Sequence, residues 1–200
     1  MKVAILIFPG VEELDFVGFL ETLAVANRVK ERKRFETELV GTVRGPIVCG
    51  GGMRVVVDKG LTEARGYDLF FVPGGGASRG TGVDVVSQDE RVLELLRNTV
   101  QRGKLVWSVC TGAMVLGSAG LLKGRRATTH LSFLERLGAY GAITSRRRVV
   151  SDGNVTTGGG IASSIDVGLE LVRLELGKGA ANEVRKRMEY PQAARTRLTG

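Results

Sequence analysis

Residues 104–120 constrain the fold of this 200-residue chain more than any other stretch. Residues 105–109 form a short apolar run with the length and β-branched content of a buried strand. Small and apolar residues then recur at helical spacing over 113–121. Between the two halves, Cys110 has only small neighbours, as a sharp turn from strand to helix requires. The pattern is that of a nucleophile elbow, G-x-S-x-G, with Cys110 in place of the Ser and Ser108 in place of the first Gly.

A cysteine at such a bend lies over the positive end of a helix dipole, which favours the thiolate over the thiol. An isolated Cys is more often a buried structural residue, but the elbow pattern favours a nucleophile at Cys110. Cys49, at the edge of a predicted hairpin, is interpreted as structural. Two Cys far apart do not form a disulfide framework, and no C-x-x-C pair indicates zinc. We therefore expect a reducing, cytoplasmic environment, no metal and no cofactor.

Apolar runs alternate with helical patterns along the whole chain. Strands are predicted at 3–8, 35–43, 67–73 and 105–109, and helices at 17–33, 88–102, 132–137, 162–176 and 180–188. Glycine turns predict two hairpins, 47–49 with 53–57 and 147–151 with 154–157. The basic C-terminal end is expected to fray. The alternation predicts one α/β domain, residues 1–200, with a mostly parallel sheet covered by helices on both faces.

In parallel sheets, ligands bind outside the carboxyl ends of the strands. Residues 9–15, residues 73–76 and Cys110 all follow predicted strands, so we expect them to meet at one rim. The backbone N–H groups of a glycine loop and of Thr111 can form an oxyanion-hole type cradle; the loop residues are Gly74, Gly75 and Gly76. A glycine-rich turn without a ligand is the alternative. Neither a phosphate-loop nor a dinucleotide fingerprint is present.

Two further side chains are candidates for proton transfer. Asp15 follows a strand end between apolar neighbours, where desolvation can keep an acid protonated near neutral pH so that it shares a proton with Cys110. Its alternative role is the N-cap of the following helix. Glu12 and Glu13 are weaker candidates. His130 is the only His, so any Cys–His pair must use it, although a lone His is more often structural.

The net charge of +8 does not by itself identify a partner. Lys and Arg are scattered, they are not interleaved with aromatic residues, and no helix-turn-helix or RNA-binding signature accompanies them. We therefore expect no nucleic-acid partner and assign the charge to solvated faces and anion steering. The opening apolar run is too short for a signal peptide, and no run approaches the ~20 residues that span a bilayer, so no membrane partner is expected.

Five segments together resemble the ThiJ/PfpI superfamily: ILIFPGVEELD at 5–15, VPGGG at 72–76, SVCTGA at 108–113, ATTH at 127–130 and VSDGNVTTGGGIASSID at 150–166. They closely resemble the isonitrile hydratase branch, which shares its elbow with the sensor domains of AraC-type regulators. The segment RMEYPQ at 187–192 is similar to that branch too. The resemblance implies a flavodoxin-like fold, similar to class I glutamine amidotransferases, and a homodimer.

The resemblance also implies roles for three residues. Cys110 would attack the electrophilic carbon, Asp15 would be the acid/base, and Thr111 would assist at the elbow. In the hydratase, the thiol adds to an isonitrile to give a thioimidate, and water then releases an N-substituted formamide. The peptidase-like branch has His where this chain has Thr111, which argues against a protease, and the deglycase branch uses a Glu on the first helix. Phe19 and Leu131 replace a Pro and a Trp frequent in the family, a difference that bears on the pocket and the substrate.

Three functional hypotheses remain at this point. The first is a hydratase or hydrolase acting on a small-molecule electrophile. The second is a ligand-sensing domain, which would need a separate partner because the chain ends at Gly200 without room for helix-turn-helix units. The third is a carbonyl- or oxidative-stress protein whose Cys110 is oxidised rather than turned over.

Overall fold

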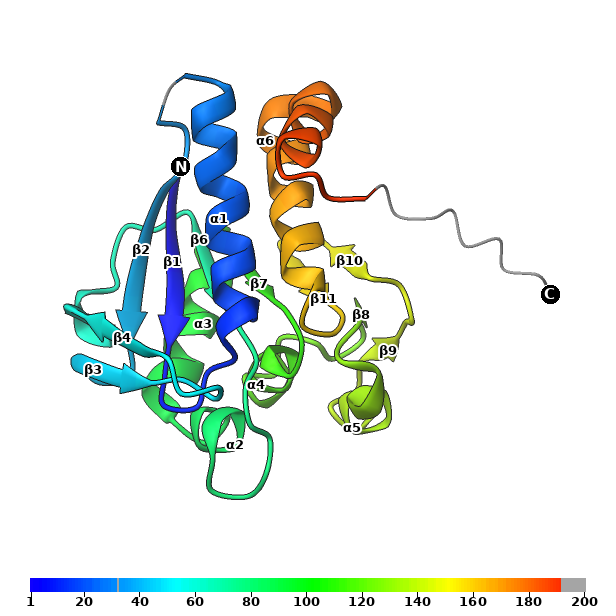
Figure 1. Cartoon of the computed structure of the whole chain (residues 1–200). Coiled ribbons are helices and arrows are strands. Elements are labelled where there is room, and N and C mark those ends of the chain that lie inside the picture. Colours follow the sequence, from blue (N-terminus) through cyan, green and yellow to red (C-terminus); the bar gives the residue numbers. More distant parts are fainter. Residues whose placement is uncertain (32, 192–200) are drawn as a thin grey trace.

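A seven-stranded sheet forms the centre of the molecule, and the computed structural model describes residues 1–31 and 33–191 (Figure 1). The predicted frayed end therefore lies, from residue 192 on, outside the described residues. The strand order is β10 (Val149–Asp152), β11 (Val155–Gly158), β7 (Leu105–Ser108), β6 (Leu69–Val72), β1 (Lys2–Ile7), β2 (Glu36–Gly41) and β5 (Lys59–Gly60). All neighbours are parallel except β10 and β11. The predicted mostly parallel sheet is confirmed.

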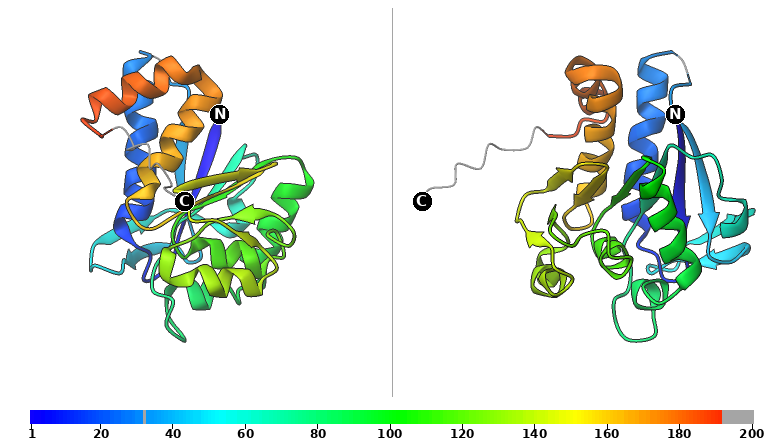
Figure 2. Two further views of the ribbon diagram at one scale, coloured as in Figure 1. Left: turned by 90° about the vertical axis from the view of Figure 1, so that its right-hand side faces the viewer. Right: turned by 180° about the vertical axis from the view of Figure 1, so that it is seen from behind.

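Helices cover both faces of this sheet, as the alternation of strands and helices predicts. Figures 1 and 2 show α1 (Glu13–Val29) and α6 (Ser163–Arg187) side by side on one face, with α3 (Glu90–Gln101) and α4 (Gly112–Ser118) on the other. The smaller elements lie at the periphery: α2 (Gly82–Val86), η1 (Leu61–Glu63), η2 (Leu131–Phe133), α5 (Leu134–Ala139), the hairpin β3 (Gly45–Val48) with β4 (Arg54–Val57), and the pair β8 (Arg126–Ala127) with β9 (Ile143–Thr144).

Several boundaries differ from the sequence prediction, each for a local reason. Helix α1 begins at Glu13 rather than at residue 17, because acidic residues in its first turn interact favourably with the helix dipole. The helices predicted at 162–176 and 180–188 are two arms of α6, which is interrupted at Gly177 with φ of 87°. The short elements β5 and α2 were not predicted, since two to five residues carry too little periodicity to recognise.

The core lies between the sheet and its helices. Strands β1 and β6 are buried almost throughout, as continuous apolar runs in a parallel sheet should be. Phe19 on α1 stacks on Phe71 of β6 with ring centroids 3.9 Å apart, and both rings are fully buried. Within the described residues, no helix has the length and apolar composition to cross a membrane.

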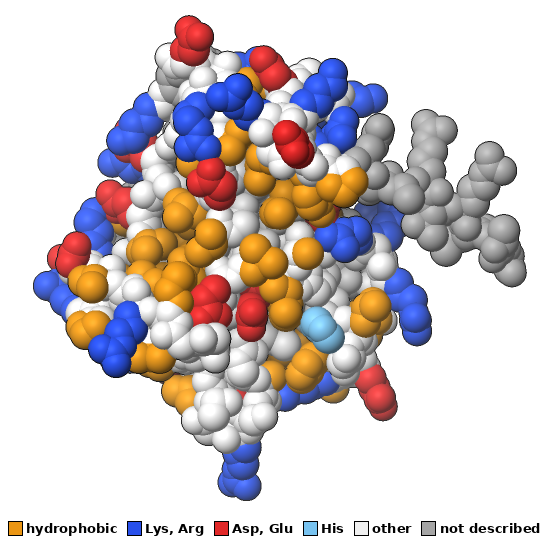
Figure 3. All heavy atoms as spheres, viewed as in Figure 1, with side chains coloured by type: hydrophobic (Ala, Val, Ile, Leu, Met, Phe, Trp, Pro, Cys, Tyr) orange, Lys and Arg blue, Asp and Glu red, His pale blue; other side chains and the backbone are white. Residues whose placement is uncertain are grey.

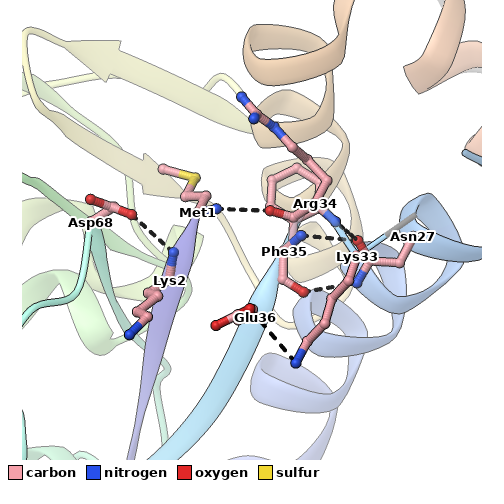
Figure 4. Close-up of polar contacts among 8 residues, drawn as sticks. All are labelled: Met1, Lys2, Asn27, Lys33, Arg34, Phe35, Glu36 and Asp68. Carbon is pink, nitrogen blue, oxygen red and sulfur yellow. Dashed lines mark hydrogen bonds and ion pairs between the residues drawn. The ribbon is translucent and has the colours of Figure 1, made fainter.

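Polar contacts fix the connection between α1 and β2 at the amino end of the sheet (Figure 4). The Asn27 side chain accepts hydrogen bonds from the backbone N–H groups of Arg34 and Phe35 at 2.8 and 2.9 Å, and donates to the Phe35 carbonyl at 2.8 Å. The ammonium group of Met1 donates to the Arg34 carbonyl at 2.8 Å. These bonds hold the beginning of β2 in register beside β1, so the two strands also end side by side, at the rim of the sheet.

We expect Asn27→Ala to lower the free energy of unfolding by about 1–3 kcal/mol, because it leaves part-buried backbone groups without partners. Urea denaturation followed by circular dichroism measures the change. Asn182→Ala, on the exposed side of α6, is the matched control and should leave stability unchanged or slightly higher. Equal stabilities of the two variants would contradict this role for Asn27.

Candidate active site

Cys110 lies at a sharp bend between β7 and α4. Its φ of 54° is in the left-handed region that residues with a side chain rarely occupy. The Cys110 N–H donates to the carbonyls of Gly159 at 2.7 Å and Gly158 at 3.2 Å, and its own carbonyl accepts from the Thr129 hydroxyl at 2.7 Å. Both backbone groups of the strained residue are thereby held in place. The sharp bend expected from the sequence is present, and Thr129 is a supporting residue that the sequence analysis did not single out.

Two glycines allow the chain to pack closely around this bend. A Cβ on Gly112 would lie 2.3 Å from the Val72 carbonyl oxygen, so only glycine lets the start of α4 lie against the end of β6. A Cβ on Gly74 would lie 2.7 Å from both the Asp15 Oδ2 and the Thr111 Oγ1. The glycine loop therefore occupies the space between the acid and the elbow. The three segments predicted to meet at the rim do meet there.

Asp15 is buried in the first turn of α1. The residue is completely inaccessible to solvent, its Oδ2 accepts the Gly74 N–H at 2.7 Å, and its Oδ1 has no partner among the described residues. The N-cap of α1 is Glu12, so the alternative that Asp15 caps the helix is wrong. Burial raises the pKa of Asp15 to about 7, and the charge of Glu12 adds to the rise, whereas the Gly74 N–H and the Cys110 side chain lower it.

The Cys110 thiol does not have the lowered pKa that the helix-dipole argument predicts. Burial, followed by the charge of Asp15, raises the pKa of Cys110 to about 12, and hydrogen bonds from the Thr111 backbone and hydroxyl only partly offset this. Only 6% of the residue is exposed, and no cation is among the groups that shift its pKa. The resting group is therefore a thiol next to an acid that is half ionised near pH 7.

The N–H groups of the glycine loop have partners within the protein. Those of Gly74, Gly75 and Gly76 donate to Asp15 Oδ2, to Thr111 Oγ1 at 3.0 Å and to the Gly10 carbonyl at 3.3 Å, respectively. The Thr111 hydroxyl in turn donates to the Gly75 carbonyl at 2.9 Å. The arrangement differs from the open cradle expected from the sequence: in this state the loop positions Asp15 and Thr111. The Cys110 sulfur is contacted instead by Thr111, through both its backbone N–H and its side chain.

His130 makes local contacts. Its Nδ1 accepts the Ser132 N–H at 3.3 Å as the N-cap of η2, and its ring packs edge-on against Phe133 with centroids 6.0 Å apart. A Cβ on Gly160 would meet its Cδ2 at 3.1 Å, so the ring lies beside the turn that leads into α6. Figure 3 shows it on the same face as a pair of acidic side chains. The contact with Cys110 comes from the preceding residue, Thr129, instead.

Glu13 and Cys49 both make their contacts at the turn of the β3–β4 hairpin. The Glu13 carboxylate accepts the N–H groups of Gly51 at 2.8 Å and Met53 at 3.2 Å, and so holds the hairpin turn against α1. Cys49 is 4% exposed, its N–H donates to the Met53 carbonyl at 2.8 Å, and burial raises the pKa of its thiol. The burial of Cys49 and its hydrogen bond within the turn agree with the structural role expected for it.

The C-terminal segment is tied to the elbow through a chain of hydrogen bonds. The Tyr190 hydroxyl donates to Asp166 Oδ2 at 3.0 Å, and Arg148 donates to the same oxygen through Nε at 2.7 Å. The Arg148 carbonyl accepts the Gly159 N–H at 2.9 Å, and Gly159 in turn accepts the N–H of Cys110. The Gly159 carbonyl that binds Cys110 is thus supported by Arg148 and by its partners Asp166 and Tyr190, which lie 18 and 42 positions further along the chain. No local sequence signal reveals contacts over such separations.

The two departures from the ThiJ/PfpI pattern occupy different environments. Phe19 is part of the core beneath α1, where it stacks on Phe71. Leu131 is 60% exposed in η2, next to His130. Of these two positions at which the chain differs from the family pattern, only Leu131 therefore lies at the surface, near the turn into α6. No group of three or more His, Cys, Asp or Glu side chains that could hold a metal occurs within the described residues.

Comparison with known proteins shows the family of this chain. The sequence model of the DJ-1/PfpI family matches residues 1–174. The chain belongs to this family. It is 36% identical over 193 residues to the isonitrile hydratase of Pseudomonas putida, covering 96% of this chain and 80% of that protein. It is 29% identical to the HTH-type transcriptional regulator CdhR of Pseudomonas aeruginosa, covering 90% of this chain but 52% of the regulator.

The fold agrees with that of a solved DJ-1/PfpI relative. A ThiJ/PfpI family protein from Pseudomonas syringae superimposes with a TM-score of 0.84 at 28% identity, covering all of this chain and 78% of the other. The ThiJ/PfpI resemblance recognised from five sequence segments is confirmed, as is the flavodoxin-like arrangement it implies.

We expect iodoacetamide to alkylate Cys110 at least tenfold faster than Cys49 at pH 7.5, although both thiols are buried and have raised pKa values. The reason is that Asp15, with a pKa of about 7, lies beside the Cys110 thiol, whereas the carboxylate near Cys49 is that of Glu13, whose lowered pKa makes it a weaker base. The rate at Cys110 should rise with pH through about 7, as Asp15 loses its proton and can accept that of the thiol. Peptide mass spectrometry of timed samples measures both sites.

Asp15→Asn supplies the control for this experiment, since Asn has a similar shape but takes no proton. The rise near pH 7 should disappear in this variant while the rate at Cys49 stays the same. Equal rates at the two cysteines, or an unchanged pH profile in Asp15→Asn, would contradict a shared proton between Asp15 and Cys110.

Proposed function

We propose that this protein is an enzyme that uses Cys110 to hydrate a small electrophile, converting an isonitrile and water into an N-substituted formamide. The observation that carries the proposal is the buried pair of Asp15 and Cys110, in which an acid with a pKa of about 7 lies next to a nucleophile on a strained bend. General acids and bases work best when their pKa is near the working pH. The 36% identity to an isonitrile hydratase supports the reaction class.

In the first step, the Asp15 carboxylate takes the proton of the Cys110 thiol while the sulfur bonds to the terminal carbon of the isonitrile. Asp15 then delivers that proton to the same carbon, which leaves a thioimidate, R–N=CH–S–Cys110, and an ionised Asp15. The S–H bond breaks, and S–C and C–H bonds form. The Thr111 N–H and hydroxyl, which lower the pKa of Cys110, stabilise the negative charge that develops on sulfur.

In the second step, water adds across the C=N bond of the thioimidate. Asp15 accepts a proton from the water and transfers it to nitrogen, giving R–NH–CH(OH)–S–Cys110. The C–S bond then breaks, the hydroxyl proton passes through Asp15 to sulfur, and R–NH–CHO leaves with the thiol restored. Each step uses one proton carrier whose free Oδ1 has no partner among the described residues. The same residues need no cofactor for this chemistry.

A sensing domain is the second candidate, and the similarity to the regulator CdhR favours it. In that case Cys110 would bind or react with a ligand without turnover. Oxidative-stress sensing has less support, because a largely buried thiol whose pKa is raised to about 12 is a poor target for oxidants. For either reading, the partner at this site is a small molecule, and the free thiols of Cys49 and Cys110 favour a reducing cytoplasm.

We also propose a homodimer. Hydrophobic side chains gather on the face shown in Figure 3, over α1 and the β3–β4 hairpin. The exposed members near the start of α1 and on this hairpin are Leu14, Val17, Val48, Met53 and Val56. A second copy on this patch would lie beside the segment that carries Asp15. Sedimentation velocity tests this: a monomer at micromolar concentration would contradict it.

The central experiment follows formamide production from a simple alkyl isocyanide by proton NMR. Wild type should turn over, and Cys110→Ala should not, because no nucleophile remains. Asp15→Asn should lose on the order of 10²- to 10⁴-fold in rate, the range of general acid–base catalysis. Cys49→Ala is the matched control and should retain activity, since the backbone hydrogen bonds of Cys49 lie within the hairpin turn.

Turnover that persists in Cys110→Ala would refute the mechanism. A folded wild type that binds isocyanide or forms one stoichiometric Cys110 adduct, without releasing formamide, would favour the sensing domain instead.

A further inference from the structure

A cavity of about 740 Å³ lies between α3 and the connection that leads from β5 through η1 to β6. Neither Cys110 nor Asp15 lines it, and the reaction proposed above makes no use of it. Its walls come from the turn after β2, from the connection 60–67 and from the side of α3 that faces this connection. The cavity is therefore a concave site separate from the Asp15–Cys110 pair.

Positive charge is in excess around this cavity. Its lining contains one acidic residue, Glu94, against five basic residues: Arg44, Arg65, Arg91, Arg102 and Lys104. Three of the five are neutralised by ion pairs outside the lining, Arg44 with Glu63, Arg91 with Asp89 and Lys104 with Asp68. Arg65 and Arg102 form no ion pair with another described residue. Two guanidinium groups are thus available for an anion.

The floor of the cavity is apolar. Tyr67 and Phe70 are buried and pack edge-on with ring centroids 6.0 Å apart, and Leu61 and Leu95 are partly buried beside them. Ligand sites commonly combine such an apolar surface with a few charged groups that fix the orientation. Guanidinium groups bind carboxylates and phosphates through paired N–H donors, which gives geometric selectivity as well as attraction.

A second cavity of about 480 Å³ extends the first. The two share Thr42, Val43 and Arg91. The second also has apolar side chains, Pro9, Val85 and Val86, and one acidic residue, Asp89, whose charge is paired with Arg91. An apolar surface next to a cationic one suits a ligand that has an anionic group on an apolar body. A purely inorganic anion would leave the apolar lining unused.

We propose that this cavity binds a small organic anion, a carboxylate or phosphate monoester carried on an aromatic or aliphatic body, with Arg65 and Arg102 holding the anionic group. The site is separate from the Asp15–Cys110 pair and does not depend on the reaction assigned to that pair. Because the guanidinium groups are exposed to solvent, binding should weaken as salt rises.

The test uses phenyl phosphate and benzoate as probes, with neutral benzyl alcohol as the comparator. Each is titrated into ¹⁵N-labelled protein, and amide and arginine Nε–H shifts are followed by NMR. The two anions should give saturable shifts within 61–67 and 91–104, and benzyl alcohol at the same concentration should not. Which anion binds more tightly identifies the preferred anionic group.

Variants separate this site from other basic surfaces. The double variant Arg65→Gln/Arg102→Gln should raise the dissociation constant at least tenfold, while Arg126→Gln, an exposed arginine outside the cavity, should leave it unchanged. Cys110→Ala should bind as wild type does. The spectra themselves report whether each variant is folded. Absence of saturable shifts, equal affinity in the double variant, or shifts centred on residues around Cys110 would overturn the proposal.

Discussion

The left-handed backbone of Cys110 is the constraint on which the rest of the site depends. A residue with a side chain in a sparsely populated backbone region costs about 1–3 kcal/mol, and such strain persists only where the surrounding structure imposes it. Here the sheet imposes it: β11, next to β7, leads into the Gly158 and Gly159 carbonyls that accept the Cys110 N–H, and Thr129 fixes the carbonyl side. The strand order of the sheet therefore also determines the position of the Cys110 side chain.

Burial then determines the electrostatics. Because Asp15 is excluded from water and receives only one backbone hydrogen bond in place of solvent, its charged form is disfavoured and its proton is retained to near neutral pH. The same burial, together with Asp15 itself, disfavours the thiolate of Cys110. Because the pKa values of both Asp15 and Cys110 are raised, the site favours transfer of a proton between them over a stable thiolate. Such a site suits the addition of a thiol to an unsaturated carbon.

Much of this arrangement follows from the sequence, since strand ends and small residues at a bend have strong local signatures. The rim that joins Asp15, Gly74 and Cys110 could be predicted because parallel strands end at one edge. The lowered pKa that the sequence predicted for the Cys110 thiol is wrong, because the helix-dipole argument omits the burial of Cys110, which the sequence does not show. The partners of the glycine-loop N–H groups and the contacts of Tyr190 with Asp166 depend on distant packing, so no local pattern indicates them.

The shared proton between Asp15 and Cys110 is the central claim, and the titration of the Asp15 carboxyl tests it directly. Carbon-13 NMR of protein labelled at aspartate carboxyl groups, with the Asp15 signal identified by its loss in Asp15→Asn, follows that group from pH 4 to 9. A midpoint near 7 is the result predicted here. A midpoint near the ordinary value of 3.8 would mean that Asp15 is a fixed carboxylate, and would contradict its role as the proton carrier for Cys110.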